Sequence, residues 1–133
     1  MKVMALDYGS ARTGVAVTDA TGTLARPVGV VERAGTEAGL RRLAELVAEE
    51  EPERIVVGLP LTLRGEQGAQ ADETQGFVAA LRQAVGIPIE LFDERFTTTL
   101  ANSGPSSRAP EDARAAAHLL ESYLVLRDRA GRA

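Results

Sequence analysis

The first feature of the chain that suggests chemistry is a carboxylate at the end of a short apolar segment. Residues 3–6 have the composition of a buried strand, and Asp7 follows them directly. Gly9 and Gly14 then bracket a tight loop, after which a second short apolar run begins. Asp-x-Gly is also ordinary turn chemistry, so this segment alone fits a structural turn as well as a functional site.

The loop between these two glycines contains groups that suit phosphate oxygens. Backbone N–H groups in a tight loop can hold an anion, and an aspartate beside them can hold a metal ion. The expected phosphate contacts are Gly9, Ser10, Arg12 and Thr13.

Two later segments bring acids that could join Asp7. Asp93 and Glu94 directly follow a predicted strand. Asp112 lies in the first turn of a helix predicted over residues 110–129, on the helical stripe that must pack on the sheet. An acid in a first turn also favours the helix dipole, so the position of Asp112 alone does not decide its role.

Apolar periodicity and turn residues predict the element order βββαβαβα. Thr36 can cap the first helix, and the apolar run at residues 54–60 reads as a strand buried on both faces. We expect strands over residues 3–6, 14–18, 27–32 and 54–60, and a fifth strand that ends at residue 92. The first helix is expected over residues 36–51 and the last over 110–129. Between them, a loop over residues 61–68 leads into a second helix that ends at about residue 85.

The helical connections predict which acids meet. Strands 1, 4 and 5 are linked through helices, so right-handed crossovers make them parallel and bring their carboxyl ends to one edge of the sheet. Asp7 closes the first of these strands, and Asp93 and Glu94 follow the last, so we expect them at that edge. Asp19 closes the oppositely directed second strand and is expected at the far edge, as a turn residue.

Three carboxylates at one edge predict a metal site. Such groups repel one another unless cations neutralise them, and oxygen ligands without His or Cys suit Mg²⁺ or Mn²⁺. Two such ions ~4 Å apart can activate a water and stabilise a leaving oxygen in phosphodiester hydrolysis. The placement of the acids therefore indicates a nuclease.

Length and composition limit the alternatives. A chain of 133 residues suits one domain, which we expect to span residues 1–133. The absence of cysteine excludes disulfides and thiolate metal sites and fits a reducing cytoplasm. No apolar run approaches ~20 residues, so we expect no membrane partner. The net charge of −4 does not itself indicate a nucleic-acid binder, although bound cations would neutralise part of it.

Four motifs, in order along nearly the whole chain, resemble the YqgF/RuvX family, bacterial proteins of RNase H-like fold related to Holliday junction resolvases. The Asp-Glu-Arg-x-Thr-Thr element together with Gly-x-Pro is the most specific part, whereas sugar kinases and actin-like ATPases share the first motif. The matching residues are Leu6-Asp7-Tyr8-Gly9 with Gly14-Val15-Ala16-Val17, Val57-Gly58-Leu59-Pro60-Leu61 with Gly65 and Gly68, Asp93-Glu94-Arg95-Phe96-Thr97-Thr98, and Asp112 with Ala115-Ala116-Ala117 and Ser122-Tyr123-Leu124.

The resemblance implies an α/β RNase H-like fold, a five-stranded mixed sheet of order 3-2-1-4-5 in which strand 2 alone runs opposite to the others. It also implies a Mg²⁺- or Mn²⁺-dependent endonuclease, which is a hydrolase that uses two bound metal ions to cleave structured nucleic acid. The family's catalytic and metal-binding carboxylates fall on Asp7, Glu94 and Asp112. Related resolvases can take an acid from the fourth strand, but residues 55–60 contain none, so the fifth strand has to supply it.

The resemblance leaves the substrate open between two nucleic acids. Family members act in 5′-end maturation of pre-16S rRNA during ribosome biogenesis, and some are described as resolvases of four-way DNA junctions. A junction resolvase needs two sites related by a two-fold axis, and hence a homodimer, to nick both strands symmetrically.

Several residues keep alternative roles at this stage. Strand alternation places Asp93 and Glu94 on opposite faces, and we favour Glu94 as the ligand for its reach, with Asp93 capping the turn or orienting Arg95. Arg95 fits a contact to the scissile phosphate equally well as a pair with Asp93. We expect Thr97 and Thr98 to help hold the metal-binding residues in place without binding the metal themselves.

Basic residues and His118 are harder to place. Arg12, Arg64 and Arg108 are candidate contacts to the nucleic-acid backbone, although exposed loop arginines are commonly just solvated. The segment over residues 97–109 is short for the family and poor in basic residues. His118 lies off the stripe of Asp112, so we expect it on the helix surface or facing a partner, not binding a metal.

Two other function classes compete with the nuclease. A sugar-kinase or actin-like ATPase uses a similar first hairpin but needs a second domain to close over its nucleotide, which 133 residues do not supply. A non-catalytic RNA-binding assembly factor is the more serious rival, and it predicts nucleic-acid binding that Asp7→Asn leaves unchanged.

Overall fold

The computed structural model describes residues 1–62, 64–97 and 110–131, and its order of elements confirms the predicted βββαβαβα pattern. A short 3-10 helix, η1, follows the last strand. The elements are β1 Val3–Asp7, β2 Arg12–Thr18, β3 Ala25–Glu32, α1 Glu37–Glu50, β4 Arg54–Leu59, α2 Ala69–Ala84, β5 Ile89–Asp93, η1 Glu94–Phe96 and α3 Glu111–Gly131.

The strands form one five-stranded sheet of order β3-β2-β1-β4-β5. β2 is antiparallel to both β1 and β3, while β1, β4 and β5 run parallel. The predicted order and the single reversed strand are therefore confirmed. The predicted start of the second strand at residue 14 is wrong, because β2 begins at Arg12 and only residues 8–11 separate it from β1.

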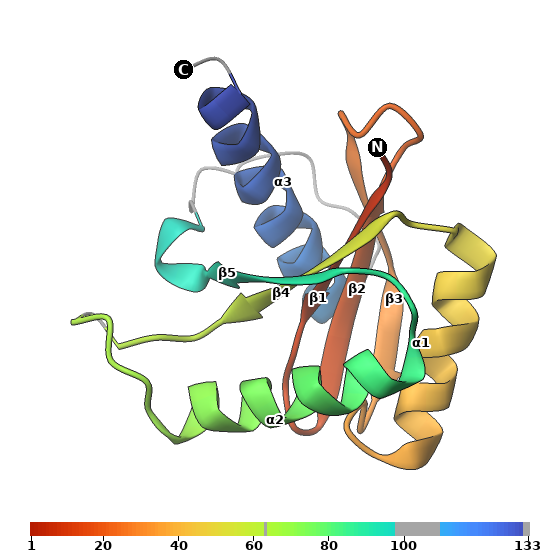
Figure 1. The fold of residues 1–133 in the computed structure, drawn as a ribbon, viewed down its shortest axis with the longest axis vertical. Helices are drawn as coiled ribbons and strands as arrows, with labels where there is room; N and C mark the ends of the chain where they lie inside the picture. Colours follow the sequence, from red (N-terminus) through yellow and green to blue (C-terminus); the bar gives the residue numbers. More distant parts are fainter. Residues whose placement is uncertain (63, 98–109, 132–133) are drawn as a thin grey trace.

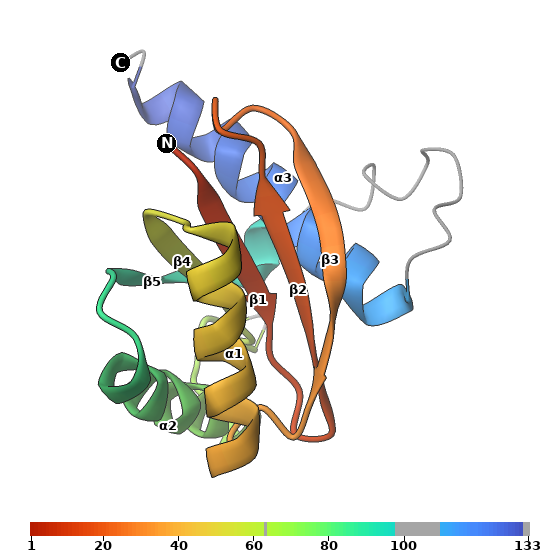
Figure 2. The same cartoon turned by 90° about the vertical axis from the view of Figure 1, so that its right-hand side faces the viewer.

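Helices cover both faces of the sheet, α1 and α2 on one side and α3 on the other (Figures 1 and 2). Alternate residues of β1 enter the two cores: Met4 and Leu6 pack on the α1/α2 side, and Val3 and Ala5 pack on the α3 side. By the same alternation, Asp7 is directed to the α3 side. The pleat of the central strand thus sets the face on which the acid lies.

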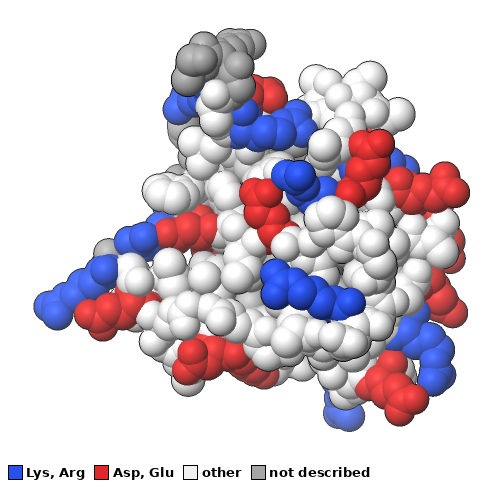
Figure 3. Space-filling model, viewed as in Figure 1, with Lys and Arg blue, Asp and Glu red and all other residues white. Residues whose placement is uncertain are grey.

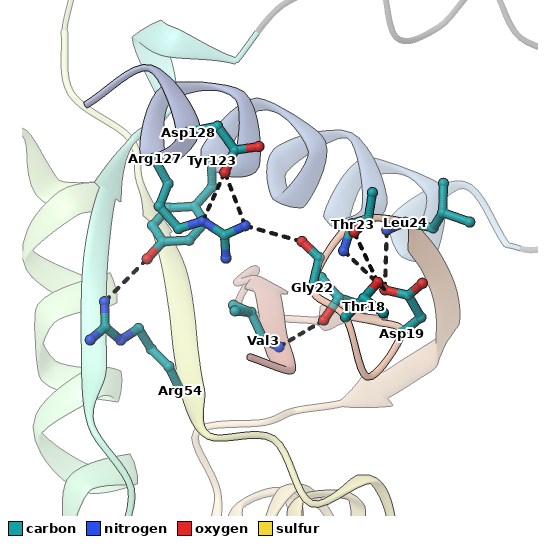
Figure 4. A network of polar contacts seen from close by, with 11 residues as sticks. Val3, Thr18, Asp19, Gly22, Thr23, Leu24, Arg54, Tyr123, Arg127 and Asp128 are labelled. Atoms are coloured by element: carbon teal, nitrogen blue, oxygen red, sulfur yellow. Dashed lines mark hydrogen bonds and ion pairs between the residues drawn. The ribbon is translucent and has the colours of Figure 1, made fainter. Parts of the chain in front are cut away.

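Local signals explain where the elements begin and turn. Thr36 caps α1, because its Oγ1 accepts a hydrogen bond from the N–H of Gly39 at 3.1 Å. Asp19 sits in the β2–β3 turn, where its Oδ1 accepts hydrogen bonds from the backbone N–H groups of Thr23 and Leu24 (Figure 4). These bonds lower the pKa of Asp19. Its predicted role as a turn residue is confirmed.

A bilayer-spanning helix is not found in the part of the chain that the structure describes.

Candidate active site

Asp7 ends β1 between two strand positions that carry no side chain. Its partner on β2 is Gly14. On β4, Val57 pairs with Leu6, so the next residue, Gly58, lies level with Asp7. Asp7 is half-buried there. The sheet therefore leaves open space on both sides of this carboxylate.

Glu94 fills the space on the β4 side. It begins η1, and its side chain lies across Gly58, where an added Cβ would be 2.6 Å from Glu94 Oε1. The carboxyl groups of Glu94 and Asp7 are hydrogen-bonded to each other. The structure thus brings Glu94, the acid favoured from the sequence, next to Asp7.

The pKa values of Asp7 and Glu94 are both raised in the folded chain. Burial raises the pKa of Glu94 to about 7, and the charge of Asp7, the hydrogen bond to Asp7 and the charge of Asp93 act in the same direction. Burial and the charge of Asp112 raise the pKa of Asp7, which the hydrogen bond from Glu94 lowers. The carboxyl group of Glu94 therefore stays protonated to a higher pH than that of an ordinary glutamate.

Asp112 approaches Asp7 from the other side, on the first turn of α3. The backbone of this turn lies against Gly14, so closely that a Cβ at Gly14 would overlap the carbonyl of Asp112. The Asp112 carboxylate pairs with Arg12, with 3.3 Å between Oδ2 and Nε. All three predicted acids therefore gather on the α3 face, with an arginine beside the outermost one.

The donor chemistry of this cluster suits a hard divalent cation, because all three groups are carboxylates and two of them already touch. Among the residues described, no three Asp, Glu, His or Cys side chains are arranged to hold a metal ion together. Asp112 is engaged by Arg12 instead. The Asp7–Glu94 pair is thus the part of the site that is already assembled.

Asp93 has a different task from Glu94. Its side chain caps η1 by accepting a hydrogen bond from the N–H of Arg95 at 2.9 Å. It also binds the Arg95 guanidinium, with 2.6 Å between Oδ2 and Nη2, and these bonds lower the pKa of Asp93. Arg95 in turn lies against Gly65 of the β4–α2 loop. Asp93 therefore orients Arg95 and fixes the turn on which Glu94 stands.

Two of the predicted phosphate contacts, Gly9 and Thr13, contact each other across the start of β2. The Thr13 side chain is fully buried, and its hydroxyl lies 3.4 Å from both the N–H and the carbonyl oxygen of Gly9. These contacts close the loop on itself. Ser10 and Arg12 are exposed, and Arg12 pairs with Asp112.

The remaining candidates divide into exposed, buried and undescribed residues. Arg64 is exposed in the β4–α2 loop, whereas the hydroxyl oxygen of Thr97 is buried and has no hydrogen-bond partner among the described residues. Thr98 and Arg108 lie outside the described residues, as does nearly all of the segment over residues 97–109.

His118 lies on α3 and is half-buried, so it is less exposed than a residue on the open helix surface. Its Nδ1 atom is buried and has no hydrogen-bond partner among the described residues. The other predicted role, that His118 faces a partner, stays a prediction.

Gly14 and Gly58 have a part in the site around Asp7 that was not predicted from the sequence. Each one admits another acid: Gly14 admits the backbone of Asp112, and Gly58 admits the side chain of Glu94. Glycine inside a strand weakens it and often marks a place where another group approaches closely. That signal was present, because both glycines lie within predicted apolar strands.

Solved structures place this fold in a class. The RuvC structure of Thermus thermophilus matches with a TM-score of 0.69 and 17% identity over 98% of this chain and 97% of that one. RuvC from the same organism in complex with a Holliday junction substrate matches with a TM-score of 0.67 and 18% identity, over 96% of each chain. The fold is therefore RNase H-like.

Sequence comparison gives the family within that class. The family model described as "RuvX: Holliday junction resolvase" matches residues 1–125, so the chain belongs to the RuvX family and the resemblance seen in its motifs is confirmed. A relative from Chloroflexus aurantiacus, named "Putative pre-16S rRNA nuclease", is 40% identical over 94% of this chain and 87% of its own length. One of the same name from Syntrophomonas wolfei is 37% identical over 93% of this chain and 94% of its length.

Proposed function

We propose that this chain is a Mg²⁺- or Mn²⁺-dependent endonuclease that processes the 5′ end of pre-16S rRNA in the cytoplasm. The observation that carries the proposal is the hydrogen-bonded Asp7–Glu94 pair, held half-buried beside the charge of Asp112. Holding carboxyl groups together costs stability, and strongly perturbed acids of this kind cluster at functional sites.

The roles of the three acids follow from their surroundings. Asp7 and Glu94 would be ligands of the cation once both carboxyl groups are ionised. Asp112 would be the third ligand once its carboxylate leaves Arg12. When bound, divalent ions in such a site neutralise the carboxylates, lower the pKa of a water and stabilise the leaving oxygen of a phosphodiester.

Basic side chains around the acids would position the substrate. Arg12, freed from Asp112, begins β2, and the exposed Ser10 lies in the loop just before it. Arg95 is held rigidly by Asp93, which suits a fixed contact to a phosphate, and Arg64 is exposed in the neighbouring loop. On the face seen in Figure 3, acidic and basic side chains are interspersed, so we expect binding to depend on a few placed arginines.

Two substrates are compatible with this site, and the relatives favour RNA. The curated relatives of about 40% identity carry a pre-16S rRNA nuclease name, and they match this chain more closely than RuvC does. The second candidate is the four-way DNA junction, supported by the description of the matching family model. Cleavage of junctions would additionally require a homodimer, because both strands must be cut symmetrically.

The test compares cleavage of a labelled pre-16S rRNA leader and a labelled four-way DNA junction in Mg²⁺ and in Mn²⁺. The variants are Asp7→Asn and, as a matched control, Asp19→Asn at the opposite end of the sheet. We expect the leader to be cut by wild type and by Asp19→Asn but not by Asp7→Asn. Leader binding without metal-dependent cleavage, unchanged in Asp7→Asn, would instead identify an RNA-binding assembly factor.

A further inference from the structure

We propose that Gly58 is a positioning residue of the acid cluster: its missing side chain leaves the path along which Glu94 crosses β4 to reach Asp7. The link to metal binding rests on the proposed function, whereas the contact between positions 58 and 94 can be tested without a metal.

The sheet register makes this crossing necessary. Gly58 pairs with Phe92 on β5, and Phe92 packs on the α3 side of the sheet. Glu94 comes two residues later and returns to that side, but β4 separates it from Asp7 on β1. Its side chain must therefore pass over β4 at the level of Gly58.

The distances show how little room there is. A Cβ on Gly58 would lie 2.6 Å from Oε1, 3.0 Å from Cγ and 3.2 Å from Cδ of Glu94. Carbon atoms in contact prefer about 3.5–4.0 Å, so any other residue at position 58 must push the Glu94 side chain away. Glu94 cannot shift as a unit, because Asp93 and Arg95 fix the turn on which it stands.

Backbone conformation does not explain this glycine. The glycines with positive φ among the described residues are Gly22 and Gly65, so Gly58 has a φ that other residues adopt readily. It is buried in a central strand, where glycine costs about 0.5–1 kcal/mol relative to alanine. The space that Glu94 needs is therefore what requires a glycine here.

Gly58 is also the better of the two glycines to test. An added Cβ at Gly14 meets the backbone of Asp112 and threatens the packing of α3. An added Cβ at Gly58 meets a side chain, which a second substitution can remove. Gly29 is a matched control, because it lies in β3 of the same sheet and nothing lies within 4 Å of its added Cβ.

The first experiment is a double-mutant cycle on metal-free protein, with Gly58→Ala, Glu94→Ala and the double variant followed by thermal unfolding. We expect Gly58→Ala to lower Tm by ~3–6 °C in the wild-type background and not at all in the Glu94→Ala background. If Gly58→Ala is unfolded but the double variant is folded, the result would support the same conclusion. Equal losses in both backgrounds, or two unfolded proteins, would overturn the proposal, since the clash would then lie elsewhere.

The second experiment measures Mn²⁺ affinity by calorimetry on the same variants. We expect Gly58→Ala to weaken binding at least ~10-fold, comparable to losing the support of a metal ligand, and Gly29→Ala to leave it unchanged. Wild-type affinity in Gly58→Ala would contradict the positioning role. A wild type that neither binds Mn²⁺ nor cleaves nucleic acid would refute the proposed function, and the unfolding cycle would still decide the contact.

Discussion

The two ends of the sheet differ in how their charged side chains are arranged. At the carboxyl end of β1, Asp7, Glu94 and Asp112 crowd together, and two of them carry raised pKa values. At the other end, polar groups are matched to partners (Figure 4). There Arg54 donates to Glu90 and to the Tyr123 hydroxyl, and Arg127 donates to the carbonyl oxygen of Gly22.

This difference separates groups that stabilise the fold from groups that do not. The paired end ties α3 to β4 and to the β2–β3 turn, so its polar contacts join elements that are distant in sequence. At the crowded end Glu94 adds a third negative charge beside Asp7 and Asp112 as it loses its proton, and these like charges repel one another until a cation arrives. Substitutions should therefore have opposite effects at the two ends, changing activity at one and stability at the other.

The largest expected effect is on cleavage at the crowded end. Asp7→Asn and Glu94→Gln keep the size of each side chain while removing its charge, so we expect at least a ~100-fold loss of nuclease rate with an intact fold. Single-turnover cleavage with Mn²⁺ measures the rate, and circular dichroism checks the fold. Cleavage at the wild-type rate by either variant would show that the substituted acid has no part in catalysis.

The next effect concerns pH and stability without metal. The pKa of Glu94 is raised in the folded chain to about 7 from an ordinary 4.5. Its stabilising contribution is therefore complete below pH 4.5 and is lost as pH rises through 7. We expect the Tm of the metal-free wild type to fall between pH 5 and 8 relative to Glu94→Gln. Parallel Tm curves for the two proteins would contradict the raised pKa of Glu94.

A smaller effect is expected from Arg12. It forms an exposed pair with Asp112, so Arg12→Ala should change stability little. If Arg12 contacts a phosphate, the variant should bind RNA several-fold more weakly at low salt, and the salt dependence of log K should fall by about one. Filter binding across a salt series measures both quantities. An unchanged slope would assign Arg12 to Asp112 alone.

The smallest effect is expected at the paired end. Tyr123→Phe removes the hydroxyl that accepts from Arg54 but keeps the ring that packs edge-on against Phe92. We expect about 0.5–1.5 kcal/mol of lost stability and unchanged cleavage. Urea unfolding and the leader assay test the two halves of this statement. A loss of cleavage with unchanged stability would erase the distinction between the two ends.

The sequence predicted the parallel strands and the meeting of the acids, because both depend on patterns visible along the chain, whereas the sheet order was implied by the resemblance to the RuvX family. Apolar runs with helical connections determine that β1, β4 and β5 are parallel, and the stripe containing Asp112 determines which side of α3 faces the sheet. From these patterns alone, without any side-chain contact, Asp7 and Asp112 were predicted to lie at the same end of the sheet.

What the sequence left open depends on close contacts. Alternation separates Asp93 from Glu94 but does not say which one crosses β4, and the crossing depends on the space above Gly58. The burial of Thr13 follows from a loop shorter than expected, in which its hydroxyl meets Gly9. Contacts of this kind depend on distances between residues that the spacing of apolar residues along the chain does not determine.

The most direct test of the account is Mn²⁺ binding to the isolated chain, measured by calorimetry at pH 8, where Glu94 is deprotonated. The account predicts that wild type and Asp19→Asn bind with the same affinity, and that Asp7→Asn and Glu94→Gln each bind at least ~10-fold more weakly. Equal affinity in all four proteins would contradict it, because the ion would then lie away from the acids at the end of β1.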